Sequence, residues 1–243
     1  MADGLCRLRV SYRKDGRLAY LGHLEVLNTL ERSIRRAGLP FSVGNGFARR
    51  MRVQFSQALP VGASSEGEYF DVMLTEEVPT GEALDMLRRA TPSHLGPLQA
   101  AYVARKVPAL EAWLNRSVWR LHVMGEGICP DALDEALGLV RQAGSITYMR
   151  GEKPRTIELG PTLVGWEFVR ALDDGTCVEM LLDTRSSNLG ALRPAVLLDA
   201  AFGQPPLASS RQSYVRVCRS AQWHEENGER MEPFDESFCA SLT

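Results

Sequence analysis

One order of secondary-structure signals occurs in both halves of the 243-residue chain, and this recurrence constrains the fold more than any other feature. In the first half, strand-like alternation and helix-like periodicity predict, in order, a strand at 5–12, a helix at 20–37, strands at 51–57 and 67–75, a helix at 80–90 and a strand at 98–106. Gly38 and Pro40 end the first helix. The predicted order is β-α-β-β-α-β.

The second half repeats this order with additional strands. The predicted elements are a strand at 117–124, a helix at 130–143, strands at 145–150, 155–159, 164–172 and 176–183, a helix at 194–202 and a strand at 213–219. Turns at 151–154 and 173–175 connect neighbouring strands. Both halves fit the split β-α-β unit, so the sequence predicts an α+β protein of two tandem ferredoxin-like domains, the second with extra strands.

The length supports two domains, because it exceeds the ~100–200 residues of a typical single domain. Pro108 ends one pattern and Asn115 begins another, which places the boundary within 107–116. We predict an N-terminal domain at 1–109, a C-terminal domain at 114–222 and an acidic tail at 223–243. The tail is polar, and we expect it to be loose or lightly docked.

The net charge of −2 conceals an uneven distribution along the chain. Residues 1–60 contain 11 Lys or Arg and 4 Asp or Glu, a balance of +7, whereas the tail has 1 against 6, a balance of −5. Arginine predominates among the basic residues, and its guanidinium pairs bidentately with phosphate or carboxylate. GC-rich coding produces the same bias, so the bias alone decides nothing.

The densest basic segment is 32–52, which is suited to a polyanion such as RNA. Its candidate binding residues are Arg32, Arg35, Arg36, Gly44, Asn45, Gly46, Phe47, Arg49, Arg50 and Arg52. Glycines allow φ > 0 and let backbone N–H groups approach an anion, arginines pair with phosphates, and an exposed aromatic ring stacks on a base. The structural alternative makes Arg35 and Arg36 partners of the helix C-terminus and Phe47 a core residue.

Two further candidates are weaker. Arg150, Lys153 and Arg155 surround a predicted hairpin turn, and Arg193 precedes a helix; beside segment 32–52 they would continue a basic groove, although hairpin charges are commonly just solvated. His23 is able to act as a general acid or base if exposed. A helical wheel places it with Leu27, Leu30 and Ile34, which favours a packed or capping histidine.

Several classes of site are not supported by the sequence. The five cysteines are scattered without a CxxC motif, so we expect reduced thiols and neither a metal site nor a cofactor in this chain. GxGxxG, GxxxxGK[ST] and GxSxG motifs do not occur. The chain has no apolar run of ~20 residues and no signal-like N-terminus, so we expect a cytoplasmic protein without a membrane partner.

Short motifs along most of 5–220 resemble the radical SAM-linked protein family. The first half contains YRK at 12–14, LGHLE at 21–25, RRAGLP at 35–40, GF at 46–47 and LPVG at 59–62, and the second contains Lys153, IEL at 157–159 and the segment 188–194. The chain departs from the family pattern at Gly22 and Gly44, where serine is usual, and at Arg49, near the position of a usual proline.

The resemblance implies a partner that is a radical SAM protein, encoded beside this chain or fused to it. That partner would carry the iron–sulfur cluster, S-adenosylmethionine and, in some members, cobalamin, and would supply the chemistry. We therefore expect an RNA-binding or substrate-recognition accessory protein in tRNA or rRNA modification or processing, with no DNA partner. Two alternatives remain: an RNA-cleaving enzyme of tandem ferredoxin-like type that uses His23 without a metal, and a module that docks an acidic surface of the partner enzyme.

Overall fold

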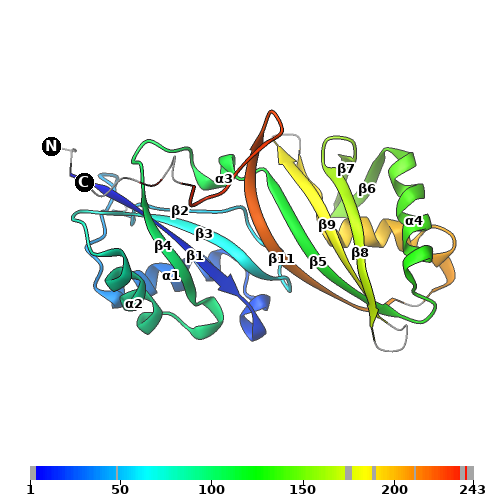
Figure 1. Cartoon of the computed structure of the whole chain (residues 1–243), viewed down its shortest axis with the longest axis horizontal. Coiled ribbons are helices and arrows are strands. Elements are labelled where there is room, and N and C mark those ends of the chain that lie inside the picture. Colours follow the sequence, from blue (N-terminus) through cyan, green and yellow to red (C-terminus); the bar gives the residue numbers. More distant parts are fainter. Residues whose placement is uncertain are drawn as a thin grey trace. The chain divides into compact units, whose positions relative to one another are not determined.

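A computed structural model describes residues 4–47, 49–172, 177–187, 190–210, 212–235 and 239 (Figure 1). The turn predicted at 173–175 and the start of the 188–194 motif lie outside these residues. The chain divides into two compact units, the first comprising Met1–Leu114 and Ala221–Thr243 and the second Asn115–Ser220. Both contain helices and antiparallel strands, so the predicted α+β class is confirmed.

The first unit is a sheet with two helices against it. Its elements are β1 (Cys6–Lys14), a 3₁₀ turn η1 (Gly16–Tyr20), α1 (His23–Ala37), β2 (Val53–Phe55), β3 (Ser64–Leu74), α2 (Thr80–Ala90), a second 3₁₀ turn η2 (Ser93–Leu95), β4 (Pro97–Val103), α3 (Leu110–Trp113), the end of β11 (Gln212–Glu226) and β12 (Glu229–Met231). The strands follow the order β4–β1–β3–β2, and each neighbouring pair is antiparallel.

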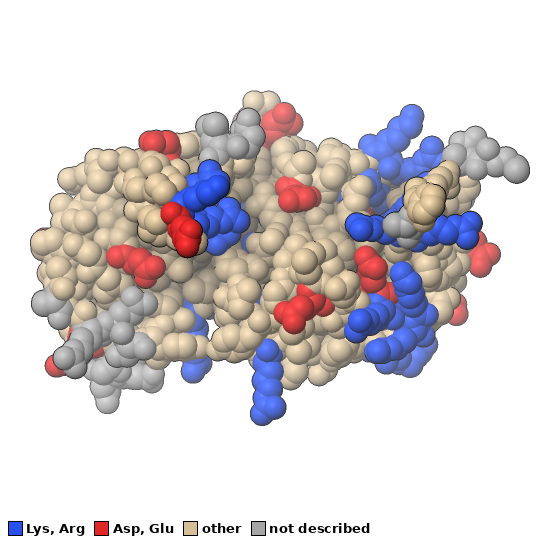
Figure 2. All heavy atoms as spheres, turned by 180° about the vertical axis from the view of Figure 1, so that it is seen from behind, with Lys and Arg blue, Asp and Glu red and all other residues tan. Residues whose placement is uncertain are grey.

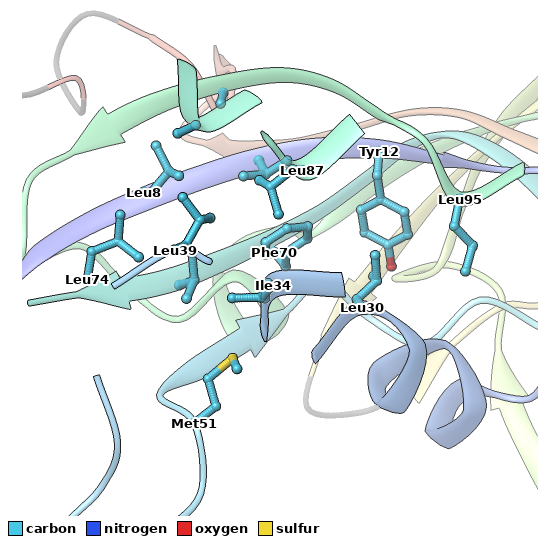
Figure 3. Packing of buried hydrophobic residues seen from close by; sticks show 14 of the residues in the cluster. Leu8, Tyr12, Leu30, Ile34, Leu39, Met51, Phe70, Leu74, Leu87 and Leu95 are labelled. Carbon is cyan, nitrogen blue, oxygen red and sulfur yellow. The ribbon is translucent and has the colours of Figure 1, made fainter. Parts of the chain in front are cut away.

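Alternating residues of the sheet form the core beneath α1 and α2 (Figure 3). Side chains two residues apart on a strand point to the same face, so the even-numbered residues of β1 and β3 meet the helices together. The buried residues of this core from β1, α1 and β3 are Leu8, Val10, Tyr12, Val26, Leu30, Ile34, Phe70, Val72 and Leu74. Each large apolar side chain buried in this way contributes about 1.5–3 kcal/mol.

Helix α1 begins later than the sequence predicts. Gly22 is its N-cap residue, and the Glu25 carboxylate accepts a 2.7 Å hydrogen bond from the Gly22 N–H. Gly38 ends the helix as predicted, with φ of 74°. Tyr20 and Leu24, two apolar residues of the predicted helix 20–37, are 64% and 72% exposed. Tyr20 ends η1, and Leu21 and Gly22 are extended, so the phase of α1 does not continue back to Tyr20.

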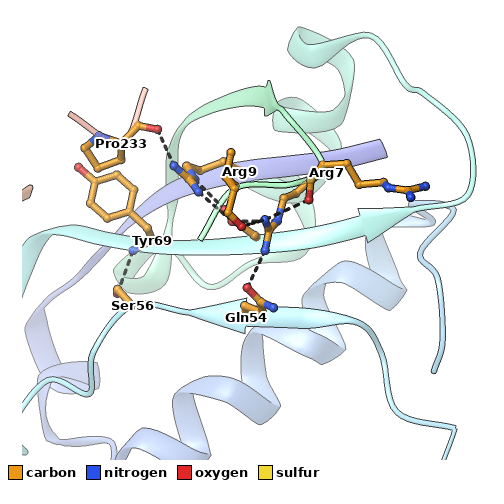
Figure 4. A network of polar contacts seen from close by, with 9 residues as sticks. Arg7, Arg9, Gln54, Ser56, Tyr69 and Pro233 are labelled. Atoms are coloured by element: carbon orange, nitrogen blue, oxygen red, sulfur yellow. Dashed lines mark hydrogen bonds and ion pairs between the residues drawn. The ribbon is translucent and has the colours of Figure 1, made fainter. Parts of the chain in front are cut away.

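The opposite face of the sheet carries a buried polar network (Figure 4). Arg9 donates two hydrogen bonds to Asp71, of 2.8 and 3.0 Å, and a third of 2.8 Å to the carbonyl of Pro233. Arg7 also lies 3.2 Å from Asp71 and donates a 2.7 Å bond to Gln54. Burial lowers the pKa of Arg7, and the Asp71 carboxylate partly offsets this.

The C-terminal segment covers this network, so the described tail residues 223–235 are docked and not loose. Strand β11 continues to Glu226 and pairs with β12, so its residues after 222 belong to a hairpin. Trp223 is buried, and the Phe234 ring lies 5.9 Å from the Tyr69 ring. An acidic composition does not prevent docking, because a strand needs only alternate side chains to face its neighbours.

The second unit contains a larger antiparallel sheet and a separate hairpin. Its elements are β5 (Arg116–Gly125), α4 (Pro130–Ala143), β6 (Ser145–Arg150), β7 (Lys153–Glu158), β8 (Leu163–Leu172), β9 (Cys177–Ser187), β10 (Gly190–Ala191), α5 (Pro194–Phe202), a 3₁₀ turn at Leu207–Ser209 and the beginning of β11. Strand β9 pairs with β5, β8 and β10, β5 neighbours β11, and β6 and β7 form a two-stranded sheet.

Candidate nucleic-acid interface

The basic segment forms a narrow hairpin between α1 and β2, here called the 43–51 hairpin. Val43 bridges Met51 in antiparallel register, the Gly44 N–H donates a 2.8 Å bond to the Arg50 carbonyl, and the Arg49 N–H donates a 3.0 Å bond to the Gly46 carbonyl. These bonds fix the backbone around the tip. The hairpin is therefore held by its own main chain.

Phe47 lies at the tip of this hairpin with its side chain in solvent. Its relative exposure is 112%, so the alternative that made it a core residue is wrong. The glycines do not supply the left-handed backbone that we expected, because the structure assigns a positive φ to neither Gly44 nor Gly46. Arg49 takes that conformation, with φ of 41°, which is uncommon for a residue other than glycine.

All six arginines of the segment are exposed, and we call them the basic patch: Arg32, Arg35, Arg36, Arg49, Arg50 and Arg52. Lys and Arg side chains gather over the first unit in the view of Figure 2. Arg35 lies 3.8 Å from Glu31 and 5.5 Å from the Phe41 ring. Within the described part of the chain, the other five have no ion-pair partner. A local structural role thus fits Arg35 better than its neighbours.

The weaker basic group lies in the second unit. Lys153 and Arg155 are exposed on the β6–β7 hairpin, where they pair with Arg150 and Tyr148 in the strand register. Arg193 is exposed at the N-cap position of α5. The predicted continuation of the basic patch by this group stays a prediction.

A polar pocket lies at the opposite end of α1 from the basic patch. We call it the α1 pocket, and it is lined by Tyr12, Lys14, His23, Val26, Ser56, Leu59 and Glu68. Lys14 is only 2% exposed and Glu68 only 3%. Lysine and glutamate are seldom buried to this degree, so the pocket is an unusual feature of the first unit.

The buried polar groups of the α1 pocket have defined partners. The Lys14 ammonium donates a 2.9 Å bond to the Leu21 carbonyl. The Ser56 hydroxyl donates a 3.0 Å bond to one oxygen of Glu68, and the Gln222 amide lies 3.5 Å from the other. His23 is exposed as the first residue of α1, so it is not the packed histidine that the wheel favoured.

Sequence reasoning missed Lys14, Ser56 and Glu68. A signal existed for two of them, because Lys14 continues the even-numbered face of β1 and Glu68 continues that of β3, where alternate residues form the core. A charged residue in phase with a buried stripe is a candidate functional residue. The match of Ser56 to Glu68 depends on chain packing and has no sequence pattern.

The described residues include all four side-chain types that commonly bind metals, namely His, Cys, Asp and Glu. In that part of the chain, no group of three or more His, Cys, Asp or Glu side chains is placed to hold a metal ion. The five cysteines are free thiols. None of the described helices is long and apolar enough to cross a membrane.

Two solved structures show a distant similarity to the chain. They are the crystal structures of a Cbf5–Nop10–Gar1 complex, with a TM-score of 0.45, and of the archaeal box H/ACA sRNP Nop10–Cbf5 complex, with a TM-score of 0.42, each at 10% identity. The matches cover 87% and 88% of this chain but 48% of the matched chains, so the chain spans about half their length. Similarity at this level supports no inference about function.

The amino-acid sequence was also compared with curated proteins and with family models. No curated protein matches the chain. The model of the family described as "Uncharacterized protein conserved in bacteria (DUF2344)" matches residues 7–194, which is more than half of the sequence. The chain therefore belongs to this family.

Proposed function

We propose that this chain binds single-stranded RNA through the basic patch and the 43–51 hairpin. One observation carries the proposal: a fully exposed Phe47 is held at the tip of a hydrogen-bonded hairpin, and arginines on the same hairpin and on α1 have no ion-pair partner among the described residues. Arginines supply phosphate contacts, and an aromatic ring supplies a surface on which any base stacks. A duplex keeps its bases stacked inside, so a single strand fits Phe47 better.

The same proposal makes the chain a recognition partner of a radical SAM enzyme that acts on tRNA or rRNA. The motif resemblance at 12–62 supports this association, and the basic patch gives the chain a part in it. The partner enzyme would carry the iron–sulfur cluster and S-adenosylmethionine. This chain would position the RNA.

We further infer that both units are ferredoxin-like. The inference is supported in the first unit by the element order β-α-β-β-α-β with strand order β4–β1–β3–β2. In the second unit, the order β11–β5–β9–β8 matches that of the first unit strand by strand, once the β6–β7 hairpin is treated as an insertion. The split β-α-β unit has the same alternation of strands and helices.

Salt-dependent RNA binding tests the proposed function. A triple variant Arg36→Ala, Arg49→Ala, Arg50→Ala is compared with a matched control, Arg89→Ala, Arg105→Ala, Arg216→Ala, which removes three exposed arginines elsewhere. Each phosphate contact contributes about −0.7 to the log–log salt slope on single strands, so the patch variant should lose about 2 units of slope. Equal slopes for the two variants would sink the proposal.

A single substitution separates stacking from charge. Phe47→Ala should weaken binding roughly fivefold or more, because stacking contributes about 1–3 kcal/mol per base, while the salt slope stays unchanged. If the patch instead docks an acidic surface of the partner enzyme, co-purification of that enzyme would survive nuclease treatment and be lost in the patch variant. That result, without RNA retention, favours a protein-interaction module.

The exposure of His23 in the α1 pocket keeps one catalytic alternative open, namely metal-independent RNA cleavage. A general acid or base must reach the reacting proton, and His23 is exposed whereas Tyr12, Lys14 and Glu68 of the pocket are buried. Any cleavage activity of the wild type should then be abolished by His23→Ala. Cleavage that persists in this variant removes His23 from consideration.

A further inference from the structure

The α1 pocket joins a buried cation and a buried carboxylate beside a small opening. Lys14 and Glu68 lie on the helix-covered face of the sheet, where the apolar core ends at Tyr12. The cavity measures about 10 Å³, room for one water-sized group. It therefore admits the polar edge of a larger molecule and not the molecule itself.

Exposed apolar side chains lie close in the sequence to the pocket-lining residues His23 and Leu59. Tyr20, Leu24 and Val61 are 64%, 72% and 66% exposed, and they flank His23 and Leu59 in the sequence. The Gly62 N–H donates a 3.0 Å bond to the Ala19 carbonyl, which holds the 60–62 turn against η1 beside the Tyr20 ring. A flat apolar ligand would find an aromatic surface next to a polar pocket.

The charges of the pocket select the class of ligand. A phosphate or carboxylate would meet the Lys14 ammonium but also the Glu68 carboxylate, which repels it. A neutral edge that both donates and accepts hydrogen bonds is able to contact the ammonium and the carboxylate without net repulsion. Nucleobases have such an edge on a planar ring, and an unstacked base is commonly read by hydrogen bonds to its edge and by stacking.

We propose that the α1 pocket binds the hydrogen-bonding edge of one unstacked base of the bound RNA, with its ring against Tyr20. This inference rests on the proposed RNA-binding function. Helix α1 connects the two regions, because its exposed residues Leu24, Asn28, Arg32 and Arg36 recur every four positions and form one stripe. At 15 residues the helix is about 22 Å long, so a strand following the stripe passes from the basic patch to the pocket.

Base preference tests the pocket separately from the patch. Affinities for 12-nucleotide rA, rC, rG and rU are measured for the wild type, Glu68→Gln, Tyr20→Ala and the control Leu98→Ala, an exposed apolar residue of β4. The wild type should prefer one oligonucleotide about tenfold, as expected for a hydrogen bond to a charged group. Glu68→Gln, which replaces an acceptor oxygen by a donor, should reduce or switch the preference with an unchanged salt slope.

Tyr20→Ala should lower affinity roughly fivefold or more for the preferred oligonucleotide. Because Tyr20 is exposed, this variant keeps the test valid if Glu68→Gln fails to fold. Salt-dependent binding without base preference would overturn the proposal for the α1 pocket but not the proposed RNA binding. A base preference that both pocket variants retain would have the same meaning. Absence of binding to all four oligonucleotides overturns both proposals.

Discussion

The arginines of β1 and those of the basic patch have opposite environments, although both belong to the basic first sixty residues. Arg9 is 1% exposed and bonded to Asp71 and Pro233, whereas Arg36 and Arg49 are exposed without an ion-pair partner among the described residues. A buried guanidinium is retained because its carboxylate partner accompanies it. An exposed, unpaired one is available to a ligand.

This difference changes the meaning of the +7 balance in residues 1–60. Three of its eleven cations, Arg7, Arg9 and Lys14, are buried in the first unit and contribute little to a phosphate-binding surface. Six others form the basic patch. Charge counted along a sequence therefore mixes structural and binding residues, and only burial separates them.

The largest effect should come from removing the shared carboxylate. Asp71→Ala leaves the Arg7 and Arg9 guanidiniums buried without a counter-charge, and we expect a loss of about 3–5 kcal/mol in the free energy of unfolding. Urea denaturation measures it. A loss below about 1 kcal/mol would mean that the two arginines reach water, and the comparison would fail.

Alkaline titration tests the burial of Tyr69, whose ring lies 5.9 Å from the Phe234 ring of the C-terminal segment. Burial, with the Glu232 carboxylate, raises the pKa of Tyr69 to about 12, so the folded state favours the neutral phenol. The raised pKa of Tyr69 therefore contributes stability that is fully present below pH 10 and is lost as the pH rises through about 12. The difference between wild type and Tyr69→Phe in unfolding free energy should change in that window; a constant difference would indicate an uncovered ring.

An intermediate case is an exposed arginine that reaches a buried carboxylate. Arg170 is 63% exposed, yet its 2.8 Å bond to Glu179, ahead of the charges of His122 and Arg120, lowers the pKa of that carboxyl. A carboxyl with a lowered pKa stabilises the fold at pH values above its pKa in the unfolded chain, near 4.5. This stabilisation is lost as the pH falls through the lowered pKa. The stability gap between wild type and Glu179→Gln should narrow between pH 6 and pH 3.

The smallest effect on stability belongs to the basic patch. Arg32→Gln with Arg36→Gln should change the unfolding free energy by less than about 0.5 kcal/mol per site. The same double variant should reduce the salt slope of single-stranded RNA binding by about 1.4, two contacts at 0.7 each. Unfolding and filter-binding assays on one preparation give both values, and a large stability loss would assign these arginines to the fold.

Local sequence patterns predicted a helix or strand well where all the residues of the pattern lie within that one element. The helix at Pro130–Ala143 has a proline at its start and glycine after its end, and the structure has these bounds. The end of β11 was missed because an acidic segment gives no apolar signal, and its pairing with β12 and the contact of Pro233 with Arg9 come from distant parts of the chain.

The α+β class, the order of most helices and strands, and the concentration of arginine around a short loop follow from periodicity and residue type alone. The burial of particular arginines, the exposure of Phe47 and the meeting of Lys14, Ser56 and Glu68 beside His23 depend on how the chain packs. Burial and side-chain proximity arise from contacts between residues far apart in the sequence, and no local pattern encodes those contacts.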